Sequence, residues 1–103
     1  MPAVRVEFHP AAIAEANAAF AWYADRDETA AALFLAELDR VSDLIAVDPE
    51  RWVPHLFGTR RIVLRRFPFS AVFRATCEVA VVFAVVHHRR RPGYWKDRLR
   101  PVS

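Results

Sequence analysis

Hydrophobic and polar residues alternate at the start of the chain, and the spacing then becomes helical. Val4, Val6 and Phe8 recur every second residue, which is typical of a half-buried strand that His9-Pro10 ends. An Ala-rich segment without glycine follows from Pro10 to about Asp25, and a proline is well tolerated in the first turn of a helix. The buried stripe of this first helix is expected to comprise Ile13, Ala16, Phe20 and Ala24, with Trp22 and Tyr23 beside its end.

A second helix is predicted from about Glu28 to Val47, where Asp48-Pro49 ends it. The short polar link between the two helices requires them to fold back as an antiparallel hairpin. The buried stripe of the second helix is expected to be Ala31, Phe34, Leu38, Val41 and Ile45. Its charged residues are expected on or near the solvent face: Glu37, Asp39, Arg40 and Asp43.

The period changes to two in the second half of the chain, which predicts three strands. The first spans Arg61 to Arg66, and the second runs from Phe69 to Thr76, with Phe69, Ala71, Phe73 and Ala75 on one face. A tight connection at Cys77-Glu78 leads into Val79–His87, which is apolar on both faces, as an interior strand is. The order β-α-α-β-β-β predicts one α+β domain over residues 1–103, an antiparallel sheet with the helical hairpin packed on one face.

Charge is distributed very unevenly along the chain. Residues 1–50 carry three basic and ten acidic residues, a net charge of −7, whereas residues 51–103 carry twelve basic and two acidic residues, a net charge of +10. The basic half includes a C-terminal tail, residues 88–103, that turns at Pro92-Gly93. Such a split indicates an anionic partner, either nucleic acid or an acidic protein segment, unless the arginines only keep a Val-rich sheet soluble.

Length and composition restrict the class of protein. A chain of 103 residues with 54% hydrophobic content supports one packed domain. The longest apolar run, Val79 to Val86, is far shorter than the roughly 20 residues of a membrane-spanning helix. The start of the sequence, Met1 to Arg5, does not resemble a signal peptide, and Cys77 cannot form an internal disulfide. We therefore expect a cytoplasmic protein with no membrane association.

Several features in a fixed order resemble the RelE/ParE toxin superfamily. An opening strand enters a Pro-started Ala/Glu helix that ends in Trp22-Tyr23, and the Asp48-Pro49 exit precedes an Arg-rich strand. The strand Phe67–Arg74 is similar to the family's aromatic-rich third strand, and Val81–His88 runs into Arg89-Arg90-Arg91. The resemblance covers nearly the whole chain, and the long hairpin is closer to the ParE side.

The resemblance implies the toxin of a type II toxin–antitoxin, or plasmid stabilisation, module that a cognate antitoxin neutralises. ParE-type toxins inhibit DNA gyrase and cleave nothing, whereas RelE-type toxins cut mRNA in the ribosome without a metal. We favour gyrase; the endoribonuclease is the alternative, and a degenerate toxin that only binds its antitoxin is a third. The antitoxin is expected to contact the hairpin aromatics and two arginines of the sheet: Trp22, Tyr23, Phe34, Arg65 and Arg74.

Candidate chemistry is concentrated in the arginines and histidines of the second half. The residues expected to bind a target or phosphate are Arg61, Arg65, Arg74, Arg89, Arg90 and Arg91. Strand parity predicts that Arg65 and Arg74 converge on the sheet face opposite the helices, although both could simply be solvated.

A nuclease would use Arg65, Arg74, His87, His88 and Tyr94. Neighbours on a strand point to opposite faces, so only one of the two histidines could join Arg74. The lysines or glutamate of the family's nucleases have no match here, and a histidine at a strand end could merely form hydrogen bonds. Tyr94 and Trp95 could stack on a base, but we favour a role in which they anchor the C-terminal tail to the sheet.

No metal or cofactor is expected. His9 and His55 lack metal-ligand spacing with any partner, and a chain with only Gly58 and Gly93 as glycines has no Gly-rich loop that could cradle a phosphate.

Overall fold

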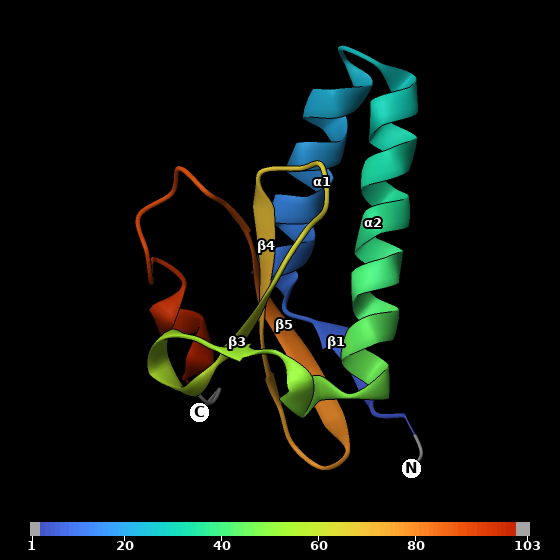
Figure 1. The fold of residues 1–103 in the computed structure, drawn as a ribbon. Coiled ribbons are helices and arrows are strands. Elements are labelled where there is room, and N and C mark those ends of the chain that lie inside the picture. Colours follow the sequence, from blue (N-terminus) through green and yellow to red (C-terminus); the bar gives the residue numbers. More distant parts are fainter. Residues whose placement is uncertain (1–2, 101–103) are drawn as a thin grey trace.

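The computed structural model describes residues 3–100; Met1-Pro2 and the last three residues of the predicted tail, 101–103, lie outside the described residues. Two long helices form a hairpin that stands against one face of a sheet (Figure 1). The helices and strands are β1 (Arg5–Phe8), α1 (Pro10–Ala24), α2 (Glu28–Val47), β2 (Val53–Pro54), β3 (Arg60–Val63), β4 (Phe69–Ala75) and β5 (Val79–His87). Three short 3-10 helices complete the chain: η1 (Pro49–Arg51), η2 (Leu56–Gly58) and η3 (Lys96–Leu99).

Side chains at the helix starts define where each helix begins. The His9 Nδ1 atom accepts a hydrogen bond from the Ala11 N–H at 3.0 Å, and the Asp27 carboxylate accepts one from the Thr29 N–H at 2.9 Å. Both caps satisfy backbone donors that the first turn of a helix leaves unpaired. The predicted bounds of α2 and the antiparallel hairpin are confirmed.

The sheet has the strand order β1-β5-β4-β3-β2. The predicted α+β architecture is confirmed, but the sheet is mixed rather than antiparallel, because β1 pairs with β5 in parallel while all other pairs are antiparallel. The reason lies in the hairpin. The Val4 N–H donates to the Ala46 carbonyl at 3.0 Å, so α2 returns the chain to the end of the sheet where β1 begins. The strands β3 and β5 then both run in the direction of β1.

Two details of the strands differ from the prediction. β3 ends at Val63 rather than at Arg66, because Arg66 adopts a left-handed conformation with φ of 68° that turns the chain toward β4. A further strand, β2, pairs with the first residues of β3 and was not predicted. Its two residues are too few to show a period, and one of them is a proline.

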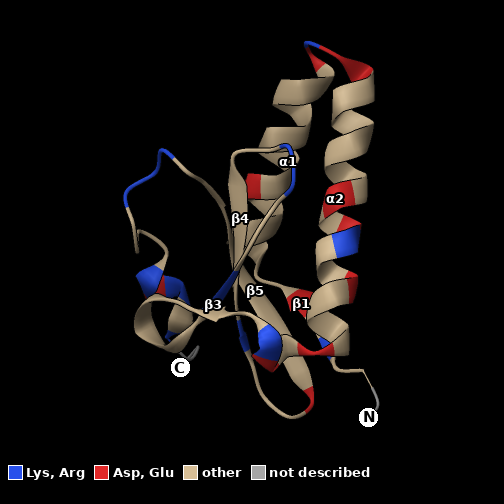
Figure 2. Ribbon diagram, viewed as in Figure 1, with Lys and Arg blue, Asp and Glu red and all other residues tan. Residues whose placement is uncertain are grey.

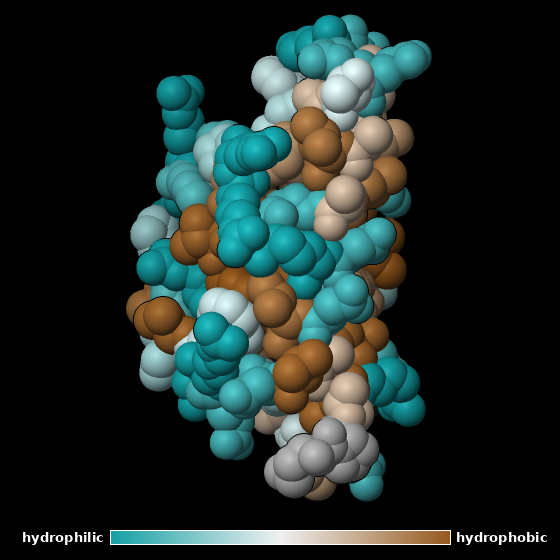
Figure 3. All heavy atoms as spheres, turned by 45° about the vertical axis from the view of Figure 1, so that its right-hand side comes forward, coloured by the Kyte–Doolittle hydropathy of each residue, from teal (hydrophilic) through white to brown (hydrophobic). Residues whose placement is uncertain are grey.

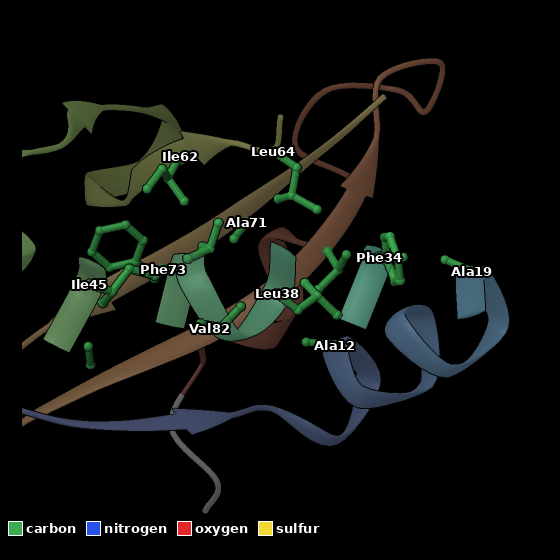
Figure 4. Packing of buried hydrophobic residues seen from close by; sticks show 13 residues of the cluster. Ala12, Ala19, Phe34, Leu38, Ile45, Ile62, Leu64, Ala71, Phe73 and Val82 are labelled. Carbon is green, nitrogen blue, oxygen red and sulfur yellow. The ribbon is translucent and has the colours of Figure 1, made fainter. Parts of the chain in front are cut away.

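The main hydrophobic core lies between the hairpin and the sheet (Figure 4). The predicted stripe of α2 is buried throughout, and Phe69, Ala71, Phe73 and Ala75 all face this core. The stripe of α1 is rotated, so that Ala12 and Ala19 are fully buried whereas Ile13 is 47% exposed. The prediction for Ile13 was wrong because α1 has apolar residues on all sides, which leaves its inward face undetermined by spacing.

A second, smaller cluster covers the opposite face of the sheet. Val72 and Ala84 of the sheet pack against Trp95 of the tail, and Trp95 is only 1% exposed. The predicted anchoring of the tail by Trp95 is therefore confirmed. Over residues 3–100, no helix is long and apolar enough to cross a membrane.

Candidate functional site

A carboxylate on α1 binds the tail to the edge of β5. β1 ends opposite Val82, so the next residues of β5 have no strand on that side. Glu15 accepts a hydrogen bond from the Val85 N–H at 3.1 Å and forms an ion pair with Arg98 at 2.8 Å. Arg98 also donates to the Phe83 carbonyl at 3.0 Å. The network replaces the missing strand and holds η3 beside α1.

Tyr94 completes this network by donating its hydroxyl to the Glu15 carboxylate. Burial, followed by the hydrogen bond to Glu15, raises the pKa of Tyr94 to about 12. The phenol therefore stays protonated at neutral pH and serves as a structural donor. The alternative of Tyr94 as a tail anchor, rather than a nuclease acid, is the one that its contacts favour.

A groove of about 430 Å³ opens next to this network, between α1 and the end of the β4–β5 pair. We call it the α1 groove. Its walls are mostly apolar, with the Arg90 guanidinium 4.0 Å above the Tyr94 ring at the rim. The lining residues are Glu15, Ala18, Ala19, Trp22, Tyr23, Pro68, Phe69, Val85, His87, Arg90 and Tyr94.

The outer face of α1 extends this apolar surface. Glu15 is the only charged residue of α1, and it points to the tail. The solvent face therefore carries no charge, and Trp22, 54% exposed, stands where that face meets the groove. We call this face the α1 surface; after the first turn its exposed residues are Ile13, Ala14, Asn17, Ala18, Ala21 and Trp22. An uncharged face of this length on a helix is typical of a protein-binding surface.

Hydrophobic side chains also reach the surface on the α2 side of the molecule, where hydrophilic ones interrupt them (Figure 3). Leu33 and Leu35 are 46% and 45% exposed. The acidic residues at the tip of the hairpin form a polar cap, and basic residues follow the tail and the β3–β4 connection (Figure 2). The charge asymmetry of the sequence is thus an asymmetry between the hairpin and the sheet in space.

The opposite face of the sheet contains a second hollow, of about 370 Å³, which we call the open-face hollow. Arg61 lies opposite Val72, and Val63 lies opposite Ser70, so these neighbours project on the face away from the hairpin. The Ser70 hydroxyl and the His88 Nε2 atom form a hydrogen bond of 2.9 Å at its floor. Besides these five, its lining comprises His55, Val86, His87, Arg90, Pro92, Gly93 and Trp95.

Arg74 and Arg65 do not converge. Arg74 lies on the face opposite the helices, as predicted, and donates to the Phe57 carbonyl at 2.9 Å. Arg65 lies instead beside α2, where its backbone N–H donates to Glu37. Arg60 is opposite Phe73, so the position of Arg65 is six residues, roughly 20 Å at about 3.4 Å per residue, from that of Arg74 along the hairpin. The prediction failed because the register of the β3–β4 pair, which residue spacing does not reveal, sets the two arginines far apart.

The predicted nuclease residues do not form one site, although His87 and Tyr94 both line the α1 groove. His87 packs edge-on against Phe69 on the hairpin side, whereas His88 binds Ser70 on the other face, as their alternation predicted. Arg74 pairs with Val81 and His87 with Phe69, which places them roughly 17 Å apart along β4. The described residues therefore bring no guanidinium of the predicted set together with a histidine and Tyr94.

Sequence reasoning missed two carboxylates that organise the fold. Glu37, expected near the solvent face, is 9% exposed, and it accepts two hydrogen bonds from Arg40 and one from the Arg65 N–H. The bond from Arg40 is the largest cause of the lowered pKa of Glu37. Glu15 carried a usable signal, because a single acid in an otherwise uncharged helix is expected to have a partner.

The described residues contain no group of His, Cys, Asp or Glu that could hold a metal ion, and Cys77 is a free, exposed thiol.

The comparison with protein families decides the identity. Residues 6–92 match the family described as the ParE toxin of the type II toxin–antitoxin system parDE. The chain belongs to the ParE toxin family. A solved chain described as "Chromosomal ParDE TA system from P. aeruginosa" is similar to this ParE toxin with a TM-score of 0.71 and 17% identity, over 82% of this chain and 95% of the other. No curated protein sequence matches it. The predicted RelE/ParE-like fold is thereby confirmed.

Proposed function

We propose that this ParE toxin inhibits DNA gyrase in the cytoplasm and that a cognate antitoxin neutralises it, as part of a plasmid stabilisation module. The observation that carries the proposal is the α1 surface, a long uncharged helix face that continues into an apolar groove with a basic rim. The separation of Arg74 from His87 and Tyr94 supports a toxin that acts by binding a protein. The endoribonuclease alternative loses support for the same reason.

The antitoxin occupies the α1 surface in this proposal, where Trp22 and Tyr23 of the expected contacts line the groove. Phe34, also expected as a contact, is fully buried in the core and is not accessible to a partner. Ala18 and Ala21 allow a second backbone to approach α1 closely, and the α1 groove accepts one large apolar side chain beside Trp22. Arg90 at the rim suits an acidic residue that follows this anchor. The expected partner is therefore an amphipathic segment that orders on binding, with an apolar stripe and acids along one side.

Ala18→Glu tests this binding mode, because it places a charge at the mouth of the groove. Binding of the antitoxin should weaken by about 100-fold or more, since a buried unpaired charge costs several kcal/mol. Cells that express both proteins should then stop growing, as they do with toxin alone. Ala36→Glu, an exposed alanine of α2, is the matched control and should still be neutralised. Equal neutralisation of both variants would refute the assigned surface.

Histidine variants separate gyrase inhibition from mRNA cleavage. His87→Ala and His88→Ala should each leave growth inhibition largely intact, because surface recognition depends on no single acid or base. A nuclease that lost its general acid or base would slow by about 10² to 10⁴. Survival after induction of either variant, with codon-phased mRNA cleavage by the parent toxin, would establish the nuclease. Survival after induction of the parent toxin itself would indicate a degenerate toxin.

A further inference from the structure

We infer that the open-face hollow is a binding site for a phosphate group, carried by a nucleotide or by a nucleic-acid strand. The site lies on the opposite side of the sheet from the α1 surface, and it does not depend on gyrase inhibition. Only Arg90 and His87 border both it and the α1 groove.

The register of the sheet forms the floor of the hollow. Ser70 lies between Val63 and Val86, and Val72 lies between Arg61 and Ala84, in two adjacent cross-strand rows. The tail from Pro92 to Trp95 closes the side next to β5, and His55 stands against the Trp95 ring at 6.0 Å between ring centroids. The floor of the hollow therefore belongs to the sheet and to the buried Trp95, whereas its rim comes from the connections on either side.

The ionisable side chains that line the hollow are all arginines and histidines. His55, Arg61, His88 and Arg90 line it, and none of its lining residues is acidic. Over residues 3–100, no carboxylate forms an ion pair with Arg61 or Arg90. Burial, followed by the nearby charge of Arg61, lowers the pKa of His55. Basic side chains are thus clustered here with no acidic side chain among them. Such a cluster attracts an anion from solution.

The hydrogen-bonding groups fit phosphate. A guanidinium donates two parallel N–H groups to two phosphate oxygens, a geometry that Arg61 can offer at the rim. Where Nε2 of His88 carries the proton, it donates to the Ser70 oxygen, and the Ser70 hydroxyl is then free to donate to the ligand. A phosphate carries up to two charges and three acceptor oxygens, so it satisfies this cluster better than a single carboxylate does.

The test is an NMR titration of the full chain with inorganic phosphate, a nucleoside monophosphate, a short single-stranded oligonucleotide and an acidic peptide. Phosphate should shift the resonances of Ser70, His88 and His55, and saturation should raise the pKa of His55 because binding and protonation are reciprocally linked. Arg61→Ala should weaken phosphate binding about tenfold or more, and Arg61→Lys should weaken it less. Arg26→Ala, at the far tip of the hairpin, removes the same charge and should change nothing.

The ligands also distinguish the source of the phosphate. Equal affinity for phosphate and the monophosphate indicates a single-group site, and much tighter binding of the oligonucleotide indicates a strand; both support the inference. Equal losses in Arg61→Ala and Arg26→Ala would show diffuse attraction and overturn it. Tighter binding of the acidic peptide, or no shift at Ser70 and His88 in folded protein, would overturn it as well.

Discussion

Glu37 shows how one buried carboxylate can position a whole connection. It receives the two donors of Arg40 from its own helix and the N–H of Arg65 from the loop after β3. The loop turns at Arg66 without a glycine, in a conformation with positive φ that is unfavourable for a bulky residue. The hydrogen bond to Glu37 offsets part of this cost and holds the β3–β4 connection against α2.

Glu37→Gln should therefore lower the free energy of unfolding by roughly 1.5 to 3 kcal/mol, because charged hydrogen bonds are lost from a buried group. The pKa of Glu37 is lowered in the fold, so its contribution is present above about pH 4.5 and is lost as the pH falls through the lowered folded value. As the pH falls through this range, the free energy of unfolding measured with urea should decrease more for the wild type than for the variant. Asp39→Asn on the exposed side of α2 is the control, and an equal effect there would contradict the account.

At the scale of elements, the tail takes the place of a neighbouring strand along the part of β5 that β1 does not reach. Tyr94 and Arg98 meet Glu15 at the edge that β1 leaves open, and Trp95 fills the cluster on the other face of the sheet. The tail therefore forms part of the folded structure up to Arg100, and Arg90 and Tyr94 of the tail complete the lining of the α1 groove.

Removal of one hydroxyl tests this docking. Tyr94→Phe should cost about 1 to 2 kcal/mol of unfolding free energy, since it deletes a hydrogen bond to a carboxylate. Tyr23→Phe makes the same chemical change at a tyrosine whose hydroxyl forms no hydrogen bond with residues 3–100, and it should be nearly neutral. Hydrogen exchange at the Val85 and Arg98 amides should accelerate in the first variant alone. Indistinguishable exchange in the two variants would argue against a docked tail.

The sequence was sufficient where spacing and local chemistry determine structure. The stripe from Ala31 to Ile45 and the Asp48-Pro49 exit predicted α2 with its bounds. The parallel pairing of β1 was not predictable, because it depends on where the hairpin returns the chain, a contact between Val4 and Ala46. The end of β3 was missed since nothing in the residue type marks Arg66 as a turn position.

In the candidate sites, too, local features were predictable from the sequence and long-range contacts were not. Parity placed Arg74 and separated His87 from His88, because alternation is a local property of a strand. The open-face hollow needed three separate segments, which His55, Ser70 and the tail contribute, and their meeting is set by sheet register and by the burial of Trp95.

At the scale of the molecule, charge divides the surface into an acidic hairpin tip and a basic sheet side (Figure 2). Arg89, Arg90 and Arg91 are all exposed in the turn that follows β5. Such a cluster raises the rate of association with an anionic target and is screened by salt.

Replacement of Arg89, Arg90 and Arg91 by alanine should weaken gyrase binding about tenfold or more at low salt and by less at high salt. The control variant replaces Arg5, Arg26 and Arg51, which changes the net charge equally at dispersed exposed positions. Surface plasmon resonance over a salt series measures both. Equal losses for the two variants would mean that net charge, and not the basic turn, attracts the target.

The most direct test of the account is a supercoiling assay with purified DNA gyrase, relaxed plasmid and this ParE toxin, with and without its antitoxin. The account predicts that the toxin stops supercoiling and that the antitoxin restores it. Unimpaired supercoiling in the presence of excess folded toxin, accompanied by cleavage of translated mRNA in induced cells, would contradict it.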